Sequence, residues 1–154
     1  MKENEKSILL ELLEDGRKNI SEIAENLDIS RQTVSKKIRE MKQEGIIKSF
    51  TLKIDENAVG LGTKAYVFLE IVPSSELRHR FVQEAKKIKK ISQIHHTFGR
   101  FDMVLEVLAE NERDLNGILD RVRDFEAVEE TETLIRKYTE KNDAQDPFRS
   151  VLGL

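Results

Sequence analysis

The sequence predicts an α+β protein with an N-terminal winged helix-turn-helix and a C-terminal ferredoxin-like β-α-β-β-α-β sandwich. Three observations predict it. Apolar residues recur at helical spacing over much of residues 1–53, glycines interrupt the chain at a hinge over 54–62, and strand-like and helical segments alternate over 63–139. Residues 140–154 begin as a polar C-terminal tail. The length of 154 residues suits one domain or two small ones.

Three helices are expected in the first part. Isoleucine and leucine recur at helical spacing over about 4–14. Asn19 and Glu22 have the spacing of a capping box, which starts a very short second helix. Ser30 is a good N-cap for the third helix, and Gly45 is its natural C-terminal residue. Three helices in this order, of which the second is very short, indicate a helix-turn-helix.

Residues 46–54 partly alternate between apolar and polar, which predicts one or two short strands, the wing. The charge of this region is unusual for the chain. Ile29–Lys53 holds seven basic and two acidic residues, a balance of +5 in a chain whose net charge is −3. A basic island on an acidic body can place one face on phosphate groups while the body repels them. We therefore expect double-stranded DNA as a partner.

The third helix is expected to carry the DNA contacts. Val34, Ile38 and Met41 recur at inward-facing positions, so the polar side chains between them point outward. The N-terminal residues of such a helix approach base edges in the major groove, and flanking cations hold the backbone. The predicted DNA-contacting residues are Ser30, Arg31, Gln32, Thr33, Ser35, Lys36, Arg39, Lys48 and Lys53. The alternative is a three-helix bundle that mediates only protein contacts, and the short second helix and basic third helix argue against it.

The second part is predicted to form a four-stranded antiparallel sheet. Strands are expected at 63–72, 91–98, 102–108 and 128–138, with helices that begin after Pro73-Ser74-Ser75 and at Asn111. The first and third strands are largely apolar on both faces, so we expect them at the centre. Two helices cover one face of this sheet, and the apolar strip on the other face needs a cover. A second copy of the chain is the simplest cover, which predicts a homodimer.

The layout and several motifs resemble the Lrp/AsnC family of transcriptional regulators. The resemblance covers about residues 3–139, and its motifs are residues 8–17, Ser21-Glu22-Ile23-Ala24, Ser30-Arg31-Gln32-Thr33-Val34, Gly45-Ile46-Ile47 and Thr97-Phe98-Gly99-Arg100-Phe101-Asp102. It implies a winged helix-turn-helix joined to a ligand-sensing domain. Members of the family form dimers that assemble further, often into octamers, and bind amino acids between subunits. They tend to regulate genes of amino-acid metabolism, so an amino-acid-like effector is expected.

The last motif is a candidate effector site. An amino acid brings a carboxylate and an ammonium group, so its site needs donors and an acceptor. The turn offers backbone N–H groups, a guanidinium and a carboxylate, and its glycine allows close approach of a ligand. The predicted effector-binding residues are Thr97, Gly99, Arg100, Phe101 and Asp102. Arg100 stands where family members are often acidic, so we expect a changed effector or none. The alternative to an effector site is an ordinary β-turn with exposed charges.

Enzyme and metal chemistry are not expected. The chain has no cysteine, and His95 and His96 are adjacent, so on a strand they face opposite ways and share no metal. We expect no catalytic residues, no metal and no cofactor. Some AsnC-like proteins resemble this architecture yet decarboxylate siroheme-type tetrapyrroles with histidine and arginine, so His95, His96 and Arg100 keep that alternative open. An effector-independent architectural DNA-binding protein is another.

No run of the sequence approaches the roughly 18 apolar residues of a spanning helix, so we expect no membrane partner. The first residues lack the apolar core of a signal peptide. A cytoplasmic location is therefore expected.

Overall fold

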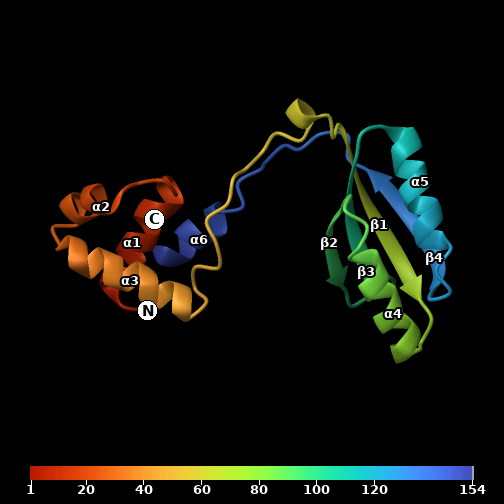
Figure 1. Cartoon of the computed structure of the whole chain (residues 1–154), viewed down its shortest axis with the longest axis horizontal. Helices are drawn as coiled ribbons and strands as arrows, with labels where there is room; N and C mark the ends of the chain where they lie inside the picture. The colour runs from red at the N-terminus through yellow and green to blue at the C-terminus, as the bar shows by residue number, and fades with distance from the viewer. Residues whose placement is uncertain (154) are drawn as a thin grey trace. The chain divides into compact units, whose positions relative to one another are not determined.

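The computed structural model describes residues 1–153 (Figure 1). The chain folds into two compact units. Unit 1 contains Met1–Lys53 together with the C-terminal residues from Lys141 onward, and unit 2 contains Ile54–Glu140. The chain therefore passes between the units twice, once after Lys53 and once after Glu140.

Unit 1 is helical. Its helices are α1 (Glu3–Glu14), α2 (Ile20–Asn26), α3 (Arg31–Gln43) and α6 (Asp146–Leu152). The predicted caps are present: the Asn19 side chain accepts a hydrogen bond from the Glu22 N–H, and Ser30 accepts one from the Thr33 N–H. These caps satisfy N–H groups that have no partner inside their own helices. The start of each helix is therefore set by local sequence.

A small apolar core holds α1, α2 and α3 together. Ile8, Ile23 and Val34 are fully buried, one from each helix, and Met41 near the end of α3 is almost fully buried. Leu9 and Leu12 of α1 are half-buried and pack against this cluster. The core is small because the unit is small, so polar contacts carry more of its stability than they would in a large domain.

The expected wing strands do not form. In the described chain, residues 46–54 contain no regular strand, although their alternating pattern predicted one or two. The segment leaves α3 through Gly45, whose φ of +74° suits a residue without a side chain, and the Ile47 N–H then donates to the Met41 carbonyl. A strand needs a neighbouring chain segment to bond its backbone, and the pattern alone supplies none. We call residues 46–53 the wing segment.

Unit 2 is the predicted β-α-β-β-α-β sandwich. Its elements are a short 3₁₀ turn η1 (Asn57–Val59), β1 (Thr63–Ile71), α4 (Ser75–Ala85), β2 (Ile91–His96), β3 (Met103–Ala109), α5 (Glu112–Arg123) and β4 (Val128–Ile135). The sheet is antiparallel with the order β2-β3-β1-β4, which confirms that the first and third strands are central. In the register, Ala65 of β1 lies opposite Val107 of β3 and Ile135 of β4.

The two faces of the sheet differ in cover. Alternate residues of β1 and β3, such as Val67 and Leu105, are fully buried beneath the helices. Helices α4 and α5 lie on that face (Figure 1). Beneath them the rings of Phe81 and Phe125 pack edge to face, with their centroids 5.2 Å apart. The residues between them on β1, including Tyr66, are half-buried and point to the face that carries no helix. This uncovered face is the one for which the sequence predicts a second copy.

The C-terminal tail is more ordered than its polar start suggested. Residues 146–152 form α6, which belongs to unit 1 and contacts α1. The tail carries four large apolar residues, Phe148, Val151, Leu152 and Leu154. Phe148 and Val151 are exposed and Leu152 is half-buried, whereas Leu154 lies outside the described residues. The docking that the structure contains is on the chain's own N-terminal helix.

Candidate functional site

A tight turn sets the angle between α2 and α3. Asp28 has a φ of +51°, a conformation that aspartate tolerates better than most residues. The Ile29 N–H donates to the Ala24 carbonyl, which ends α2, and Ser30 then caps α3. The short α2 and this turn present the first residues of α3 at the surface of the unit, as a helix-turn-helix requires.

The outer face of α3 is polar, basic and accessible. Arg31, Gln32, Ser35, Lys36 and Arg39 are all exposed, as the sequence predicted from the inward positions. Within residues 1–153, neither arginine takes part in an ion pair, and the Lys36 ammonium lies 3.8 Å from a carboxylate of Glu40. Unpaired cations on a convex helix face are available to phosphates and to base edges.

Ser30 and Thr33 are occupied by the cap of α3. The Ser30 hydroxyl accepts the Thr33 N–H at 3.1 Å and lies 2.8 Å from the Thr33 hydroxyl. Their hydroxyl groups therefore hold the start of the helix in shape, and a contact with DNA would use the oxygens' remaining hydrogen-bonding capacity.

Lys37 has a role that sequence reasoning missed. Its ammonium lies 3.0 Å from Glu5 of α1 and 2.9 Å from Glu40 of α3, and it is mostly covered. The hydrogen bonds to Glu40 and Glu5 raise the pKa of Lys37. The pKa of Glu5 is lowered by its bond to the Lys2 backbone and by Lys37. Lys37 thus belongs to the contact between α1 and α3 and is not free for DNA.

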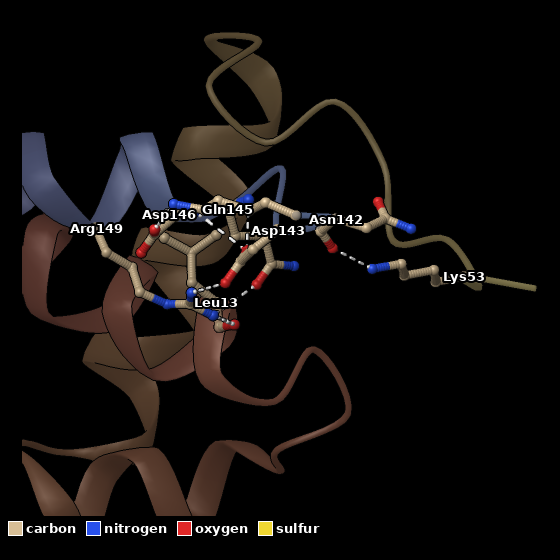
Figure 2. A network of polar contacts seen from close by, with 8 residues as sticks. Leu13, Lys53, Asn142, Asp143, Gln145, Asp146 and Arg149 are labelled. Atoms are coloured by element: carbon tan, nitrogen blue, oxygen red, sulfur yellow. Dashed lines mark hydrogen bonds and ion pairs between the residues drawn. The ribbon is translucent and has the colours of Figure 1, made fainter. Parts of the chain in front are cut away.

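The two basic residues of the wing segment differ. Lys48 is exposed and forms no ion pair in the part of the chain that the structure describes. The Lys53 ammonium instead donates a hydrogen bond of 2.6 Å to the Asn142 carbonyl of the C-terminal segment (Figure 2). Both lysines were predicted to contact the DNA backbone. In the described chain Lys48 is exposed and has no ion pair, whereas the Lys53 ammonium already has a hydrogen-bond partner.

The candidate effector residues lie together in the turn between β2 and β3. The Thr97 hydroxyl donates to the Phe101 carbonyl at 2.6 Å, and the Thr97 N–H donates to the Asp102 carbonyl at 2.9 Å. Gly99 has a φ of +134°, which a residue with a side chain rarely adopts. The structure therefore brings all five predicted residues into one closed turn.

Arg100 lies beside two carboxylates of the uncovered sheet face. Its guanidinium is 3.4 Å from Glu70 of β1 and 3.5 Å from Glu130 of β4, and it lies 4.8 Å above the Phe101 ring. Glu70 and Glu130 are directly opposite in the register, so without a cation between them they would repel. Sequence reasoning did not select these glutamates, although Glu70 interrupts an otherwise apolar strand face and could have been noticed.

Asp102 is occupied by the fold. One carboxylate oxygen accepts the Ile71 N–H at 2.9 Å, the other accepts from Arg78 of α4 at 3.2 Å, and its own N–H donates to the Leu69 carbonyl. These bonds tie the turn to the end of β1 and to α4. Both carboxylate oxygens of Asp102 therefore have a partner within the fold.

The two adjacent histidines lie on an edge strand of the sheet. His95 and His96 are consecutive on β2, and His95 lies 4.0 Å from Glu106 across the sheet. Among the described residues, no cluster of three or more potential metal-ligating side chains occurs.

A surface groove of about 710 Å³ between the end of α4 and the start of α5 shares no lining residue with either candidate site. None of the helices in residues 1–153 has the length and apolar character needed to cross a membrane.

Comparison with known proteins decides the family. A model described as winged helix-turn-helix DNA-binding matches residues 1–48, and one described as the Lrp/AsnC ligand binding domain matches residues 64–145. The chain belongs to the Lrp/AsnC family. It is 33% identical to an uncharacterised HTH-type transcriptional regulator of Pyrococcus furiosus over 141 residues, which are 90% of this chain and 94% of the relative.

Two further proteins are similar to this chain. The chain is 28% identical to the HTH-type transcriptional regulator FL11 of Pyrococcus horikoshii over 147 residues, 96% of both chains. A transcriptional regulator of Neisseria meningitidis in complex with L-Met has the same fold, with a TM-score of 0.90 at 18% identity over 98% of this chain and 99% of that one. The Lrp/AsnC chain described here therefore joins a DNA-binding helix-turn-helix to a ligand-binding domain, as a ligand-responsive transcriptional regulator does. Nothing in these relatives favours the decarboxylase alternative.

Proposed function

We propose that this Lrp/AsnC protein binds duplex DNA sequence-specifically, with the N-terminal half of α3 in the major groove. The observation that carries the proposal is the outer face of α3, where Arg31 and Arg39 are exposed and unpaired in the described chain while Lys37 is turned toward α1. Arg31 and Gln32 have the donor geometry to make two hydrogen bonds to one purine edge. Ser35 lies one turn further along the same face.

Phosphate contacts would come from cations beside the reading face. Lys36 on α3 and Lys48 on the wing segment are exposed, and each can displace a counterion from the DNA backbone. The predicted Lys53 contact requires its ammonium to leave Asn142. Ser30 and Thr33 contribute mainly by fixing the start of α3, from which the reading side chains project.

A homodimer would deliver two α3 helices to successive major grooves of a two-fold symmetric site. The uncovered sheet face supports this assembly, because Tyr66 and Phe68 are half-buried there and Leu134 of β4 is half exposed. Phe68 also contacts Phe101 of the effector turn at 5.3 Å, so the face and the turn are continuous. Further assembly of dimers into octamers is an expectation taken from the family.

The effector we propose is an amino acid or a related small molecule held at the turn. Arg100 and the N–H groups near Gly99 would bind its carboxylate, and Glu70 or Glu130 would bind its ammonium. Such a ligand would replace Arg100 on one of the two glutamates, which links binding to the uncovered face. Thr97 and Asp102 would act by holding the turn. We propose no catalytic step, and a DNA-binding role places the protein in the cytoplasm.

The test is binding to duplexes selected from a random-sequence library, each compared with a scrambled duplex of equal length. Arg31→Ala is expected to lower affinity for the selected duplex about tenfold or more and to leave the scrambled duplex nearly unchanged, because a base contact carries roughly 1–3 kcal/mol of discrimination. Lys48→Ala is expected to weaken both alike and to reduce the slope of log affinity against log salt by about 0.9 per subunit.

Lys86→Ala is the matched control, because Lys86 is an exposed lysine of unit 2 outside both candidate sites. It removes the same charge and should change neither affinity nor slope. Equal losses on both duplexes from Arg31→Ala would contradict base reading by α3. Absence of binding to any duplex at low salt would end the proposal.

A further inference from the structure

The C-terminal segment is fastened to unit 1 by a network around Arg149 (Figure 2). The Arg149 guanidinium donates to the Asp143 carboxylate at 2.8 Å, to the Gln145 side-chain oxygen at 3.1 Å and to the Leu13 carbonyl of α1 at 3.2 Å. The first two bonds shape the segment itself. The third joins residues that are 136 positions apart in the sequence.

The end of α1 offers a suitable site for this guanidinium. Leu13 lies in the last turn, where carbonyl groups lack partners inside the helix, and the Arg17 N–H donates to the Asp15 side chain instead. The last turn of α1 contains no basic residue, and its Glu11 and Glu14 are paired with Lys18, which follows the helix, so no cation of α1 itself reaches the carbonyl groups at the negative end of the helix dipole. Arg149 brings positive charge and a donor to that end.

The docked segment is small and largely exposed. On α6, Arg149 and Leu152 are half-buried, whereas Phe148 and Val151 remain exposed. A seven-residue helix with so little buried apolar surface is held mainly by its polar contacts. Segments of this kind open more readily than the core of a domain. The bond from Arg149 to the Leu13 carbonyl is therefore a large part of what holds the C-terminal segment to α1.

A second contact connects this segment to the proposed DNA interface. The Asn142 carbonyl accepts the Lys53 ammonium at 2.6 Å, at the point where the chain first leaves unit 1. Asn142 follows directly after the point where the chain returns to unit 1. When docked, the segment thus occupies a cation of the wing segment.

We propose that residues 141–152 form a latch on the DNA-binding unit, with Arg149 as its positioning residue. The closed latch withholds the Lys53 ammonium from DNA phosphates, and the open latch releases it. β4 continues into the latch through residues 136–140. A change in the sheet that opens or closes the latch would therefore also change the affinity for DNA. This inference rests on the proposed function for its DNA arm, but not for the docking itself.

Hydrogen exchange on the full-length protein tests the docking. Arg149→Ala is expected to accelerate exchange about tenfold in peptides that cover 11–16 and 141–153, because it removes the bonds that hold both segments together. Ser150→Ala is the matched control: Ser150 is exposed on the same helix and should leave both peptides unchanged. Equal exchange in wild type and Arg149→Ala would overturn the latch.

The salt dependence of DNA binding tests whether the closed latch withholds Lys53 from DNA. A purely structural role of Arg149 would not change this salt dependence. Arg149→Ala is expected to steepen the slope of log affinity against log salt by about 0.9 per subunit, and the Lys53→Ala/Arg149→Ala double variant should lose that increase. An unchanged slope in Arg149→Ala, or a steeper slope that survives the double substitution, would refute the competition for Lys53. If the wild-type protein bound no duplex, the proposed function and this competition would both fail, while hydrogen exchange would still decide the docking.

Discussion

Replacing Asp102 by asparagine should destabilise unit 2 before it affects any ligand. The carboxylate accepts the Ile71 N–H at 2.9 Å and an Arg78 N–H at 3.2 Å, and asparagine can accept only with its single oxygen. A hydrogen bond to a charged group is worth about 1.5–3 kcal/mol when covered. The Arg78 pair is more than one-third exposed on both sides, so its share falls to about 0.5 kcal/mol.

The amide oxygen of asparagine can keep the bond to the Ile71 N–H, but without the charge, which costs about 1 kcal/mol. With the lost Arg78 pair, the expected loss for Asp102→Asn is about 1.5 kcal/mol. For a unit of roughly 60–100 residues, this lowers the unfolding temperature by about 6 °C or more. Thermal unfolding followed by circular dichroism measures the shift. Arg78→Met is the control that removes the ion pair alone, and it should lower the unfolding temperature by only about 2–4 °C.

The effector response separates the two roles of this residue. If Asp102 positions the turn, Asp102→Asn should weaken the response in step with the loss of stability, and Arg100→Ala should abolish the response with little change in stability. An Asp102→Asn protein that unfolds within about 2 °C of wild type yet ignores the effector would refute the reasoning. Asp102 would then contact the ligand itself.

Three other outcomes are expected. Lys37→Ala should lower the unfolding temperature of unit 1, measured by circular dichroism, because it removes the pairs with Glu5 of α1 and Glu40 of α3. Binding titrations should show an unchanged salt dependence of DNA binding. The hydrogen bonds from Lys90 and from a backbone N–H hold the pKa of Asp114 below its ordinary value. The stabilisation by Asp114 is therefore present at neutral pH and is lost as the pH falls below about 4. Asp114→Asn should make the free energy of unfolding less dependent on pH in this acid range. Tyr66→Glu should yield monomers in sedimentation experiments, because it places a charge on the uncovered sheet face.

The local features of this protein follow from its sequence. Asn19 and Ser30 cap their helices with bonds that span three residues, so each cap needs only its own segment. The central position of the first and third strands follows from apolar residues on both faces, because edge strands tolerate polar side chains more readily. The exposure of Arg31 and Arg39 follows from the helical spacing of the buried residues between them.

Tertiary structure decides which charged groups are free. Lys37, Lys48 and Lys53 are equivalent in a count of basic residues, yet Lys37 bonds to α1, Lys53 bonds to the C-terminal segment and Lys48 stays exposed. In the same way, Asp102, a predicted effector-binding residue, has both carboxylate oxygens bonded within the fold, one to β1 and one to α4. Composition and spacing report which groups a segment carries. The partner of a charged group depends on which distant segment folds against it, and that depends on the packing of the whole chain.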